Sequence, residues 1–344
     1  MADRFIESSL SKQDTAFEVP LRPQSLDDFF GQEKVRERLE VYMGAAKQRG
    51  EPLGHCIFSG PPGLGKTTLA NIIAREMGSK IVVTSGPVIE KAGDLAGLLT
   101  NLQDGDILFI DEVHRMSRVI EEYLYPAMED FMLDLIIDSG PSARSVQVKL
   151  NRFTLIGATT RMGLLTGPLR SRFSLTCRLD YYDPDILAKM IMRSARILNL
   201  TIDLDGALEI ARRSRGTPRI ANNLIRWVRD YSQMRTKNRI DQAVVCEALE
   251  MLAIDPMGLD ELDKKILETI IEHYHGGPVG VGTLAVAIGE EKSTIEEVYE
   301  PYLILQGFIK RTLRGREATA RAYQHLGRPL PDKLREGAYS CVEC

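Results

Sequence analysis

The sequence has no long apolar segment, and its amino terminus has no secretory signal pattern. A helix that crosses a membrane needs about 18 or more consecutive apolar residues, and no window of the chain approaches that length. The first residues, Met1-Ala-Asp-Arg4, are not a basic stretch followed by an apolar one, which a signal peptide would require. We therefore expect a cytoplasmic protein that does not act at a membrane.

The sequence also has few cysteines and no excess of positive charge. The five cysteines are scattered, except for Cys341 and Cys344 at the end of the chain. Their spacing fits half of a zinc site or a redox pair, but a closed zinc site needs four ligands, and no second pair of cysteine or histidine residues lies nearby. A reduced tail is the simpler interpretation. The net charge of −4 argues against a uniformly basic surface for nucleic acid but leaves room for local patches.

Length and composition indicate a globular chain of several domains. At 344 residues, the chain is longer than one ordinary domain of about 100–200 residues. Its 44% hydrophobic and 27% charged residues supply both apolar cores and a solvated surface. We expect three domains, at residues 1–183, 184–255 and 256–344.

The first domain alternates short apolar runs with helical patterns. Apolar runs typical of buried strands occupy residues 55–59, 80–84, 106–110 and 153–157. Helical patterns occupy residues 32–49, 66–77, 91–101 and 117–130. This βαβα order predicts an α/β fold with a largely parallel sheet between layers of helices. Two alternating segments, 133–137 and 146–150, interrupt the order and predict a hairpin.

After Asp183-Pro184 the pattern becomes helical. A small all-α domain is predicted from helices at residues 184–198, 205–214, 217–235 and 240–252. A winged helix is predicted from helices near residues 262–274, 280–288 and 293–306, followed by strand-like runs at 308–312 and 319–324 that an Arg-Gly-Arg turn joins. One acid, Glu317, accompanies the basic residues of this region, which are Lys310, Arg311, Arg314, Arg316, Arg321 and Arg328.

A phosphate-binding loop lies between the first apolar run and the next helix. The segment Gly60-Pro-Pro-Gly-Leu-Gly-Lys-Thr-Thr68 matches the pattern G-x-x-x-x-G-K-[ST]. Gly63 and Gly65 let the backbone approach phosphates. Lys66 reaches the β- and γ-phosphates of ATP, and the hydroxyl of Thr67 is a ligand for Mg²⁺. A bare glycine turn is the alternative, and the flanking strand and helix disfavour it.

Two carboxylates end the third apolar run, in the segment Ile107-Leu-Phe-Ile-Asp-Glu-Val-His114. At the carboxyl edge of a parallel sheet they would lie beside the phosphate loop. Asp111 is predicted to orient the ligands of Mg²⁺, and Glu112 is predicted to position and polarise the attacking water. A strand that ends in a capping aspartate is common by itself, but the combination with the loop predicts ATP hydrolysis.

With these residues, the chain resembles the AAA+ ATPases and, more narrowly, the bacterial RuvB family of Holliday-junction branch-migration motors. The resemblance extends from about Phe17 to Gly327 and includes strings outside the shared nucleotide motifs. These strings are Thr84-Ser-Gly-Pro-Val-Ile-Glu-Lys-Ala-Gly-Asp94, Tyr125-Pro-Ala-Met-Glu-Asp130, Leu155-Ile-Gly-Ala-Thr-Thr-Arg161, Arg212-Arg-Ser-Arg-Gly-Thr-Pro-Arg-Ile-Ala-Asn222 and Ile288-Gly-Glu-Glu291. It implies an α/β P-loop AAA+ domain, a small helical lid domain and a C-terminal winged-helix domain.

The resemblance also assigns roles to single residues. It implies that Thr160 senses the γ-phosphate and that Arg219 is a second sensor. Arg172 resembles an arginine finger that acts on a neighbouring subunit, and Arg170 is the less favoured candidate. The residues implied to bind the nucleotide are Leu21, Arg22, Gly63, Gly65, Lys66, Thr67, Thr68, Glu129, Asp130, Phe131, Arg172, Tyr182 and Arg219.

For the whole protein, the resemblance implies an ATP hydrolase that drives branch migration of Holliday junctions in recombination and DNA repair. It implies a homo-hexameric ring on duplex DNA, with ATP and Mg²⁺ as cofactors and with Arg311 and Arg316 on the DNA backbone. The hairpin within residues 131–150 is implied to bind the junction-binding protein RuvA. The RuvC resolvase is a further implied partner.

Two other classes of protein share such a nucleotide site. A protein-remodelling AAA+ unfoldase usually has an aromatic pore loop and no basic winged helix. A DNA-bound initiator or regulator uses ATP as a switch, and it does not require repeated turnover stimulated by duplex DNA. The DExH helicases share the string Asp-Glu-Val-His, but this chain has one phosphate loop and one α/β domain.

Overall fold

The computed structural model describes residues 19–137, 144–236 and 238–332. These residues form two compact units. One unit extends to Met190 and includes Thr217–Arg219, whereas the other contains Ile191–Gly216 and the described residues from Ile220 onward. Among the described residues, no helix combines the length and the apolarity that crossing a membrane requires.

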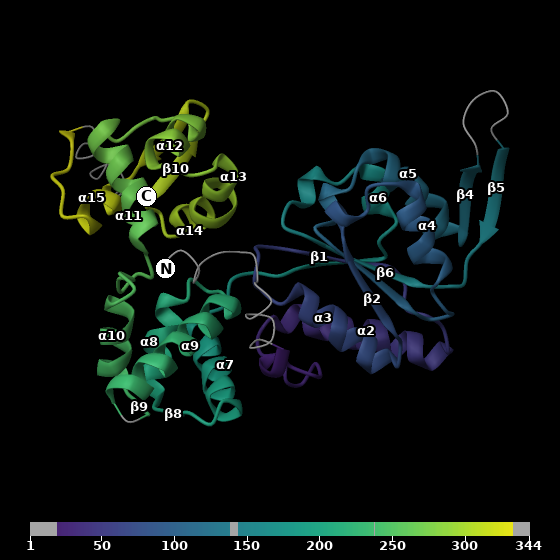
Figure 1. Ribbon diagram of the computed structural model, residues 1–344, viewed down its shortest axis with the longest axis horizontal. Coiled ribbons are helices and arrows are strands. Elements are labelled where there is room, and N and C mark those ends of the chain that lie inside the picture. Colours follow the sequence, from purple (N-terminus) through teal and green to yellow (C-terminus); the bar gives the residue numbers. More distant parts are fainter. Residues whose placement is uncertain (1–18, 138–143, 237, 333–344) are drawn as a thin grey trace, which may run out of the picture. The chain divides into compact units, whose positions relative to one another are not determined.

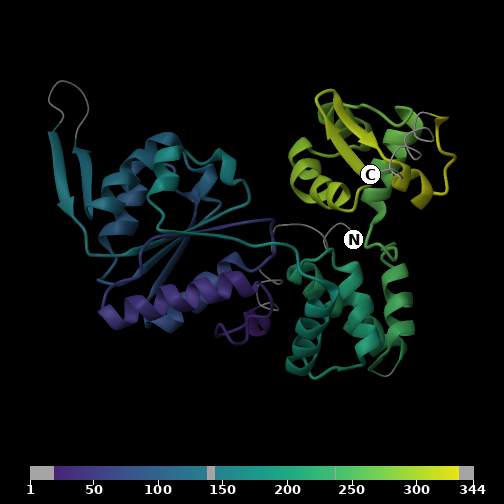
Figure 2. The same cartoon turned by 180° about the vertical axis from the view of Figure 1, so that it is seen from behind.

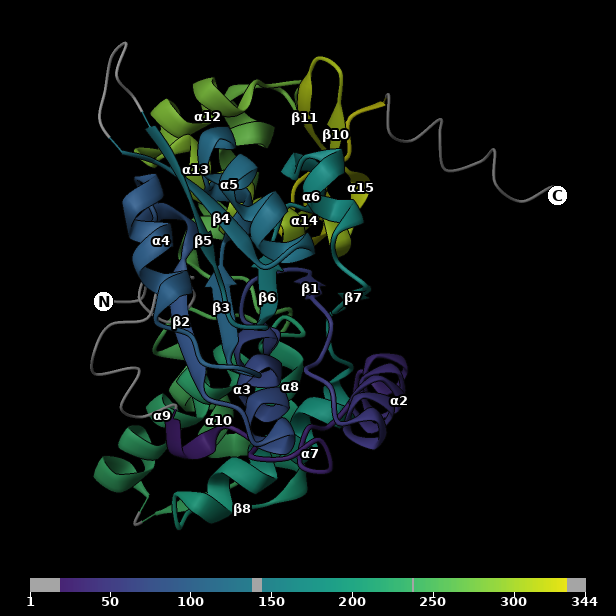
Figure 3. The same cartoon turned by 90° about the vertical axis from the view of Figure 1, so that its right-hand side faces the viewer.

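The first unit is built on a five-stranded parallel sheet with the order β2-β3-β6-β1-β7, which can be followed across Figure 3. The strands are β1 (Cys56–Ser59), β2 (Ile81–Ser85), β3 (Ile107–Asp111), β6 (Thr154–Thr159) and β7 (Leu175–Arg178). Every residue of β1 and β6 is buried, because helices cover both faces of the sheet. Such strands appear in the sequence as continuous apolar runs, and four of the five were predicted from those runs.

Helices form a layer on each face of this sheet (Figure 1). One layer consists of α2 (Glu33–Arg49) and α3 (Lys66–Met77), and the other of α4 (Ala92–Thr100), α5 (Arg118–Glu129) and α6 (Gly167–Ser171). The start of α5 is set by Ser117, whose hydroxyl accepts a hydrogen bond from the amide of Ile120. Thr166 caps α6 in the same way, by accepting from the amide of Leu169. The core between α4, α5 and the sheet contains Leu108, Leu124 and Phe153, which are almost completely buried.

A separate two-stranded hairpin is inserted between α5 and β6, as predicted (Figure 2). It consists of β4 (Met132–Ile137) and β5 (Arg144–Lys149) in antiparallel register, with Leu133 opposite Val148. The predicted turn of the hairpin, Ser139-Gly-Pro-Ser142, lies outside the described residues.

Four further helices follow the sheet. They are α7 (Pro184–Ile197), α8 (Leu204–Arg213), α9 (Pro218–Arg235) and α10 (Gln242–Glu250), with a short parallel pair of strands, β8 (Thr201–Ile202) and β9 (Arg239–Ile240), between them. Aspartates at the N-cap positions, Asp203 and Asp241, set the starts of α8 and α10. The predicted helices differ from these by at most two residues at each end.

The C-terminal part is a winged helix, but its last segment was predicted wrongly. Its elements are α11 (Glu261–Glu268), α12 (Val281–Ile288), α13 (Lys292–Thr294), α14 (Glu300–Leu305), β10 (Ile309–Thr312), β11 (Gly315–Ala318) and α15 (Ala320–His325). A π-helical segment, Thr269–His273, continues α11, and another, Ile295–Tyr299, joins α13 to α14. The second strand therefore precedes Thr319, and the predicted strand at 319–324 is a helix. Thr319 occupies its N-cap position in extended conformation, and the Ala-Arg-Ala-Tyr-Gln-His segment contains no β-branched residue that would favour a strand.

The hairpin of the wing turns at Leu313 and Arg314, because Thr312 pairs with Gly315. The prediction of a turn at Gly315 itself was therefore wrong. Gly315 is needed for another reason: a Cβ at this position would lie 2.3 Å from the carbonyl oxygen of Val279, which pairs with β11 through Arg316.

Candidate nucleotide-binding site

The phosphate loop lies at the carboxyl edge of the sheet, between β1 and α3. Gly60, Gly63 and Gly65 have φ angles of 139°, 77° and 102°, which favour glycine. Space requires glycine as well, because a Cβ on Gly60 would lie 2.3 Å from the carbonyl oxygen of Leu179. Helix α3 has no acidic residue in its first turn, so the positive end of its dipole is available to an anion.

Lys66 is the first residue of α3 and is only 8% exposed. Its Nζ donates hydrogen bonds to the carbonyl oxygens of Gly60, at 2.8 Å, and Pro61, at 2.7 Å. Burial, with a smaller contribution from Arg219, lowers the pKa of Lys66 to about 8, against the opposing effects of Asp111 and Glu112. The loop therefore encloses an ammonium group that is partly desolvated, and such a group attracts phosphate strongly.

Asp111 is the last residue of β3 and Glu112 follows it, at the same edge of the sheet and within electrostatic range of Lys66. Glu112 has a left-handed backbone, with φ at 48°, which turns the chain sharply after the strand. Its Oε2 lies 2.8 Å from Nη1 of Arg115, in an ion pair whose side chains are 38% and 58% exposed. An exposed pair of this kind contributes at most about 1 kcal/mol, so the Glu112 carboxylate can leave Arg115 for water or substrate with little penalty.

The structure adds His114 and Thr159 to this edge. The Oγ1 of Thr159, the fully buried last residue of β6, lies 2.9 Å from Nδ1 of His114 and accepts a hydrogen bond of 3.0 Å from the amide of Arg161. These contacts determine where β6 delivers the next residue, the predicted sensor Thr160. His114 ends the acidic string and could have been found there, whereas two adjacent threonines cannot be distinguished from sequence.

Arg219 and Tyr182 are held against the phosphate loop. The amide of Arg219 donates to the carbonyl oxygen of Gly63 at 3.4 Å, and a Cβ on Gly63 would lie 2.7 Å from Cγ2 of Thr217. Tyr182 is 5% exposed and donates its hydroxyl hydrogen to the carbonyl oxygen of Leu64 at 3.1 Å. Both residues were predicted to bind the nucleotide, and both contact the loop that would hold it.

Arg172 lies at the amino ends of the strands, whereas the phosphate loop lies at their carboxyl ends. Strands β1 and β7 are parallel, with Cys56 opposite Leu175; the loop follows β1, whereas Arg172 precedes β7. Four residues of strand span roughly 13 Å. The guanidinium donates to Glu129 Oε2, at 2.9 Å, and to the carbonyl oxygen of Pro168, at 2.8 Å, and stacks 4.4 Å above the Tyr125 ring.

The remaining residues predicted to bind the nucleotide do not form one group in this chain. Tyr182 lies at the phosphate loop, and Leu21 is buried in the 3-10 turn Val19–Leu21, which Arg22 follows. Glu129–Phe131 lie instead near Arg172, because the ring of Phe131 packs 6.4 Å from that of His55, the residue before β1. The Glu129–Phe131 segment therefore lies at the amino ends of the strands, away from the chain's own phosphate loop.

Family models match nearly all of the described chain. The model of the Holliday junction DNA helicase RuvB P-loop domain matches residues 21–179, the RuvB AAA lid domain matches residues 182–255, and the RuvB C-terminal winged helix domain matches residues 256–327. The chain belongs to the RuvB family. Its fold class, a P-loop AAA+ domain with a lid and a winged helix, is thereby confirmed.

Individual RuvB proteins are similar over almost their full lengths. The Holliday junction branch migration complex subunit RuvB of Protochlamydia amoebophila is 68% identical over 326 residues, which cover 95% of this chain and 98% of that protein. The solved structure of the RuvB Holliday junction branch migration motor of Thermotoga maritima is 51% identical, with a TM-score of 0.84, over 91% of this chain and 100% of that one. A point variant of the same motor gives 50% identity and a TM-score of 0.84, over 90% and 99% of the two chains.

The two predicted DNA contacts of the RuvB wing differ in their surroundings. Arg311 is exposed, as is Arg314, and neither forms an ion pair within the part of the chain that the structure describes. Arg316 is 7% exposed, and its Nη2 lies 2.8 Å from Glu300 and 3.1 Å from Glu296. The geometry gives Arg316 a role in holding the wing against the preceding helices, and leaves Arg311 as the better placed of the two for DNA.

The pKa of Lys66 predicts how ATP affinity of this RuvB protein depends on pH. Below about pH 8 the lysine carries its charge, and affinity should be flat. Above that value the ammonium loses its proton, so ATP affinity should fall by up to about tenfold per pH unit. The fall should stop at the pKa that Lys66 has in the complex, which the bound phosphates raise. The measurement is a nucleotide-binding titration between pH 7 and roughly pH 9.5, a range in which a guanidinium stays charged. Lys66→Arg is the control, and a flat wild-type profile would contradict the low pKa.

Proposed function

We propose that this protein is an ATP-driven motor that moves Holliday junctions along DNA in recombination and repair. The observation that carries the proposal is one chain with a complete phosphate loop, Arg219 beside it and a basic winged helix, matched by RuvB domains from residue 21 to residue 327. The cytoplasm, where chromosomal DNA lies in bacteria, is the proposed location.

The test is ATP-dependent movement of a synthetic four-way junction with homologous arms, with and without a junction-binding partner. Wild-type protein should convert the junction to duplex products, and Lys66→Ala should not. A switch-like regulator would bind the junction but show no repeated turnover stimulated by duplex DNA. That result would contradict the motor.

Within the site, the residues divide the work of hydrolysis. Lys66 and the start of α3 hold the phosphates. Thr67, in the first turn of α3, and Asp111 are the proposed Mg²⁺ ligands, and a hydroxyl with a carboxylate is a donor set of the oxygen type that Mg²⁺ prefers. The metal supplies neutralisation of phosphate charge. Glu112 accepts a hydrogen bond from the attacking water and orients it, and Thr160 marks the position of the γ-phosphate.

A homo-hexameric ring would explain the position of Arg172. This residue cannot serve its own phosphate loop, because the two lie at opposite edges of one sheet. In a ring, the edge that carries Arg172 and the Glu129–Phe131 segment can face the phosphate loop of the next subunit. Hydrolysis would then require that subunits close on one another, since an arginine finger stabilises the charge of the transition state.

DNA contact by the wing predicts different outcomes for its two arginines. Arg311→Ala should weaken duplex binding equally on unrelated sequences and reduce the salt slope by roughly one unit, because phosphate contacts carry no sequence information. It should not change the Tm. Arg316→Ala should also lower the stability of the winged helix, by about 3–5 kcal/mol, because Glu296 and Glu300 lose their partner.

Binding across a salt series and thermal unfolding are the two measurements. Arg328→Ala is a matched control, since Arg328 lies outside the hairpin and is paired with Glu272. Wild-type affinity and slope in Arg311→Ala would place the DNA contact elsewhere.

The β4–β5 hairpin is the proposed binding site for RuvA. Its apolar residues alternate in sequence, and Val146 on β5 is 42% exposed. Ile136→Glu with Ile137→Glu should abolish RuvA binding in a pull-down or titration while basal ATPase activity survives. Lys149→Glu, a charge change on the same hairpin, should retain binding. Retained binding in the double variant would remove the hairpin from the interface. RuvC is proposed as a further partner in junction processing.

A further inference from the structure

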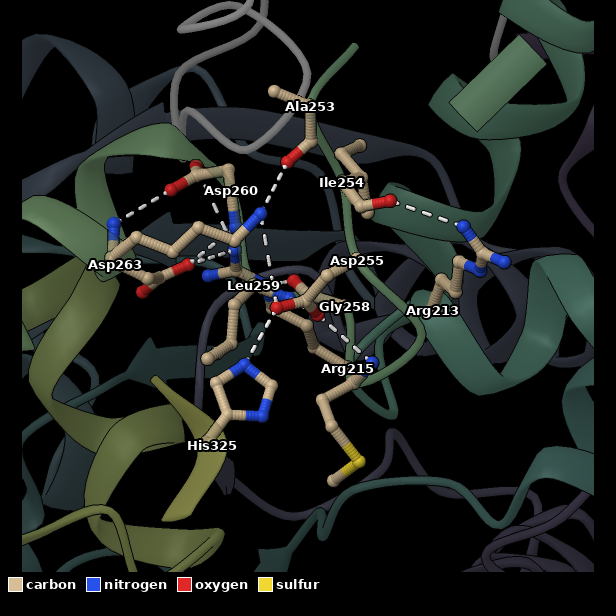
Figure 4. A network of polar contacts seen from close by, with 12 residues as sticks. Arg213, Arg215, Ala253, Ile254, Asp255, Gly258, Leu259, Asp260, Asp263 and His325 are labelled. Carbon is tan, nitrogen blue, oxygen red and sulfur yellow. Dashed lines mark hydrogen bonds and ion pairs between the residues drawn. The ribbon is translucent and has the colours of Figure 1, made fainter. Parts of the chain in front are cut away.

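The side chain of Arg215 makes buried polar contacts that connect the segment before α9 to the start of the winged helix (Figure 4). Its side chain is 3% exposed. Nη2 contacts the carboxylate of Asp263 and lies 3.6 Å from that of Asp260, and Nε donates to the carbonyl oxygen of Gly258 at 2.8 Å. The guanidinium also stacks 5.1 Å from the centre of the Tyr302 ring. Four different groups of the winged helix thus hold one arginine.

The residues of the winged helix that contact Arg215 are held in place by further hydrogen bonds. Asp260 and Asp263 cap α11 reciprocally: the amide of Asp263 donates to Asp260 at 2.8 Å, and the amide of Asp260 donates to Asp263 at 3.0 Å. Asp255 accepts hydrogen bonds from the amides of Met257 and Leu259, both at 2.9 Å. The loop that joins the lid to the winged helix therefore has its polar groups fixed by side chains on both sides.

Close packing adds to this rigidity. Gly258 has a φ of 73°, and a Cβ there would lie 2.7 Å from the carbonyl oxygen of Arg213. Only glycine allows the loop to lie this close to the end of α8. Movement of α8 relative to α11 would have to break these contacts together.

The backbone of Arg215 is itself unusual. Its φ is 53°, in the left-handed region, and Gly216 follows at 69°. A residue with a side chain in this region carries roughly 1–2 kcal/mol of strain and persists where its surroundings determine it. The buried contacts of the guanidinium supply such surroundings.

The same short segment of chain reaches the nucleotide site. Thr217 and Arg219, which lie two and four residues after Arg215, belong with the phosphate loop and contact Gly63. One end of the segment 215–219 is therefore bound at the phosphate loop, and the other end is bound to the domain that carries the wing. The segment 215–219 is therefore a short covalent connection between Arg219 and Arg215.

We propose that Arg215 is a positioning residue that transmits nucleotide-dependent movement of Thr217–Arg219 to the winged helix through Asp260 and Asp263. This inference rests on the proposed motor function. A buried ion pair suits the role because breaking it leaves an uncompensated charge, so the helical and winged-helix parts move together. An apolar contact of the same size would allow them to slide.

The test compares ATP consumed with junction movement in Arg215→Met/Asp263→Asn. This double change removes the charges of Arg215 and Asp263. It keeps the volume of the arginine stem and an acceptor for the amide of Asp260. The expected result is an ATPase rate within about twofold of wild type and a ratio of ATP hydrolysed per base pair moved that rises by ~tenfold, the size of a typical coupling between sites. The matched control is Arg213→Met/Glu209→Gln, which removes another buried pair at the end of α8 and should keep the wild-type ratio.

Each outcome decides the inference. Thermal unfolding establishes that the variants are folded; where the double variant is not, Arg215→Lys is scored by the same ratio, which should lie above wild type. A wild-type ratio in the folded variant overturns the inference, as does an equal rise in the Arg213 control. A wild-type protein that hydrolyses ATP without moving the junction contradicts the proposed function and the inference with it.

Discussion

Glu112→Gln should bind ATP about as tightly as wild type and hydrolyse it about a hundredfold to ten-thousandfold more slowly. In the proposed mechanism the carboxylate positions and polarises the attacking water, and the amide that replaces it has the same shape but is a much weaker base. The phosphate loop, with Lys66 and the start of α3, is untouched by this change. The variant should therefore accumulate in the ATP-bound state.

Lys66→Ala should behave differently. Its loss removes the ammonium that the loop encloses, so ATP binding itself should weaken. Nucleotide titration and single-turnover hydrolysis on both variants separate binding from chemistry. Glu122→Gln, at an exposed position of α5, is the matched carboxylate control and should resemble wild type. Equal loss of ATP binding in the Glu112 and Lys66 variants would show that the two roles are not divided in this way.

Arg172→Ala should bind ATP normally but lose about a thousandfold or more of the hydrolysis rate, which is the usual effect of removing an arginine finger. Its position at the edge opposite the phosphate loop predicts that the defect lies in the neighbouring site. Mixing Arg172→Ala subunits with Lys66→Ala subunits should therefore restore activity at interfaces where an intact finger faces an intact phosphate loop.

The mixing experiment needs two comparisons. Arg170→Ala alters the exposed arginine two residues earlier on α6, and a larger defect there than in Arg172→Ala would transfer the role to Arg170. Thermal unfolding is measured as well, because Arg172→Ala also removes the contacts with Glu129 and Tyr125. Failure of every mixing ratio to restore hydrolysis would contradict action between subunits.

Much of the fold could be predicted because its signals are local. The buried strands β1, β3 and β6 are continuous apolar runs, and the helices begin at capping residues such as Ser117. Strand β7 was missed because its Leu-Thr-Cys-Arg sequence lies at the edge of the sheet and only Cys177 is buried. The second strand of the wing was misplaced because it begins at Gly315, and glycine usually indicates a turn.

The sequence alone determined the chemistry at the phosphate loop, because Lys66, Thr67 and the glycines act within a few residues of one another and the backbone places them. The resemblance identified Arg172, Glu129 and Arg316, but their surroundings depend on contacts between distant segments. Only the tertiary structure decided that Arg172 and Glu129 lie together at the edge away from the loop, and that Arg316 is buried against Glu296 and Glu300. Parallel strand order sets the first arrangement and the packing of the wing on its helices sets the second, and neither leaves a local pattern in the chain.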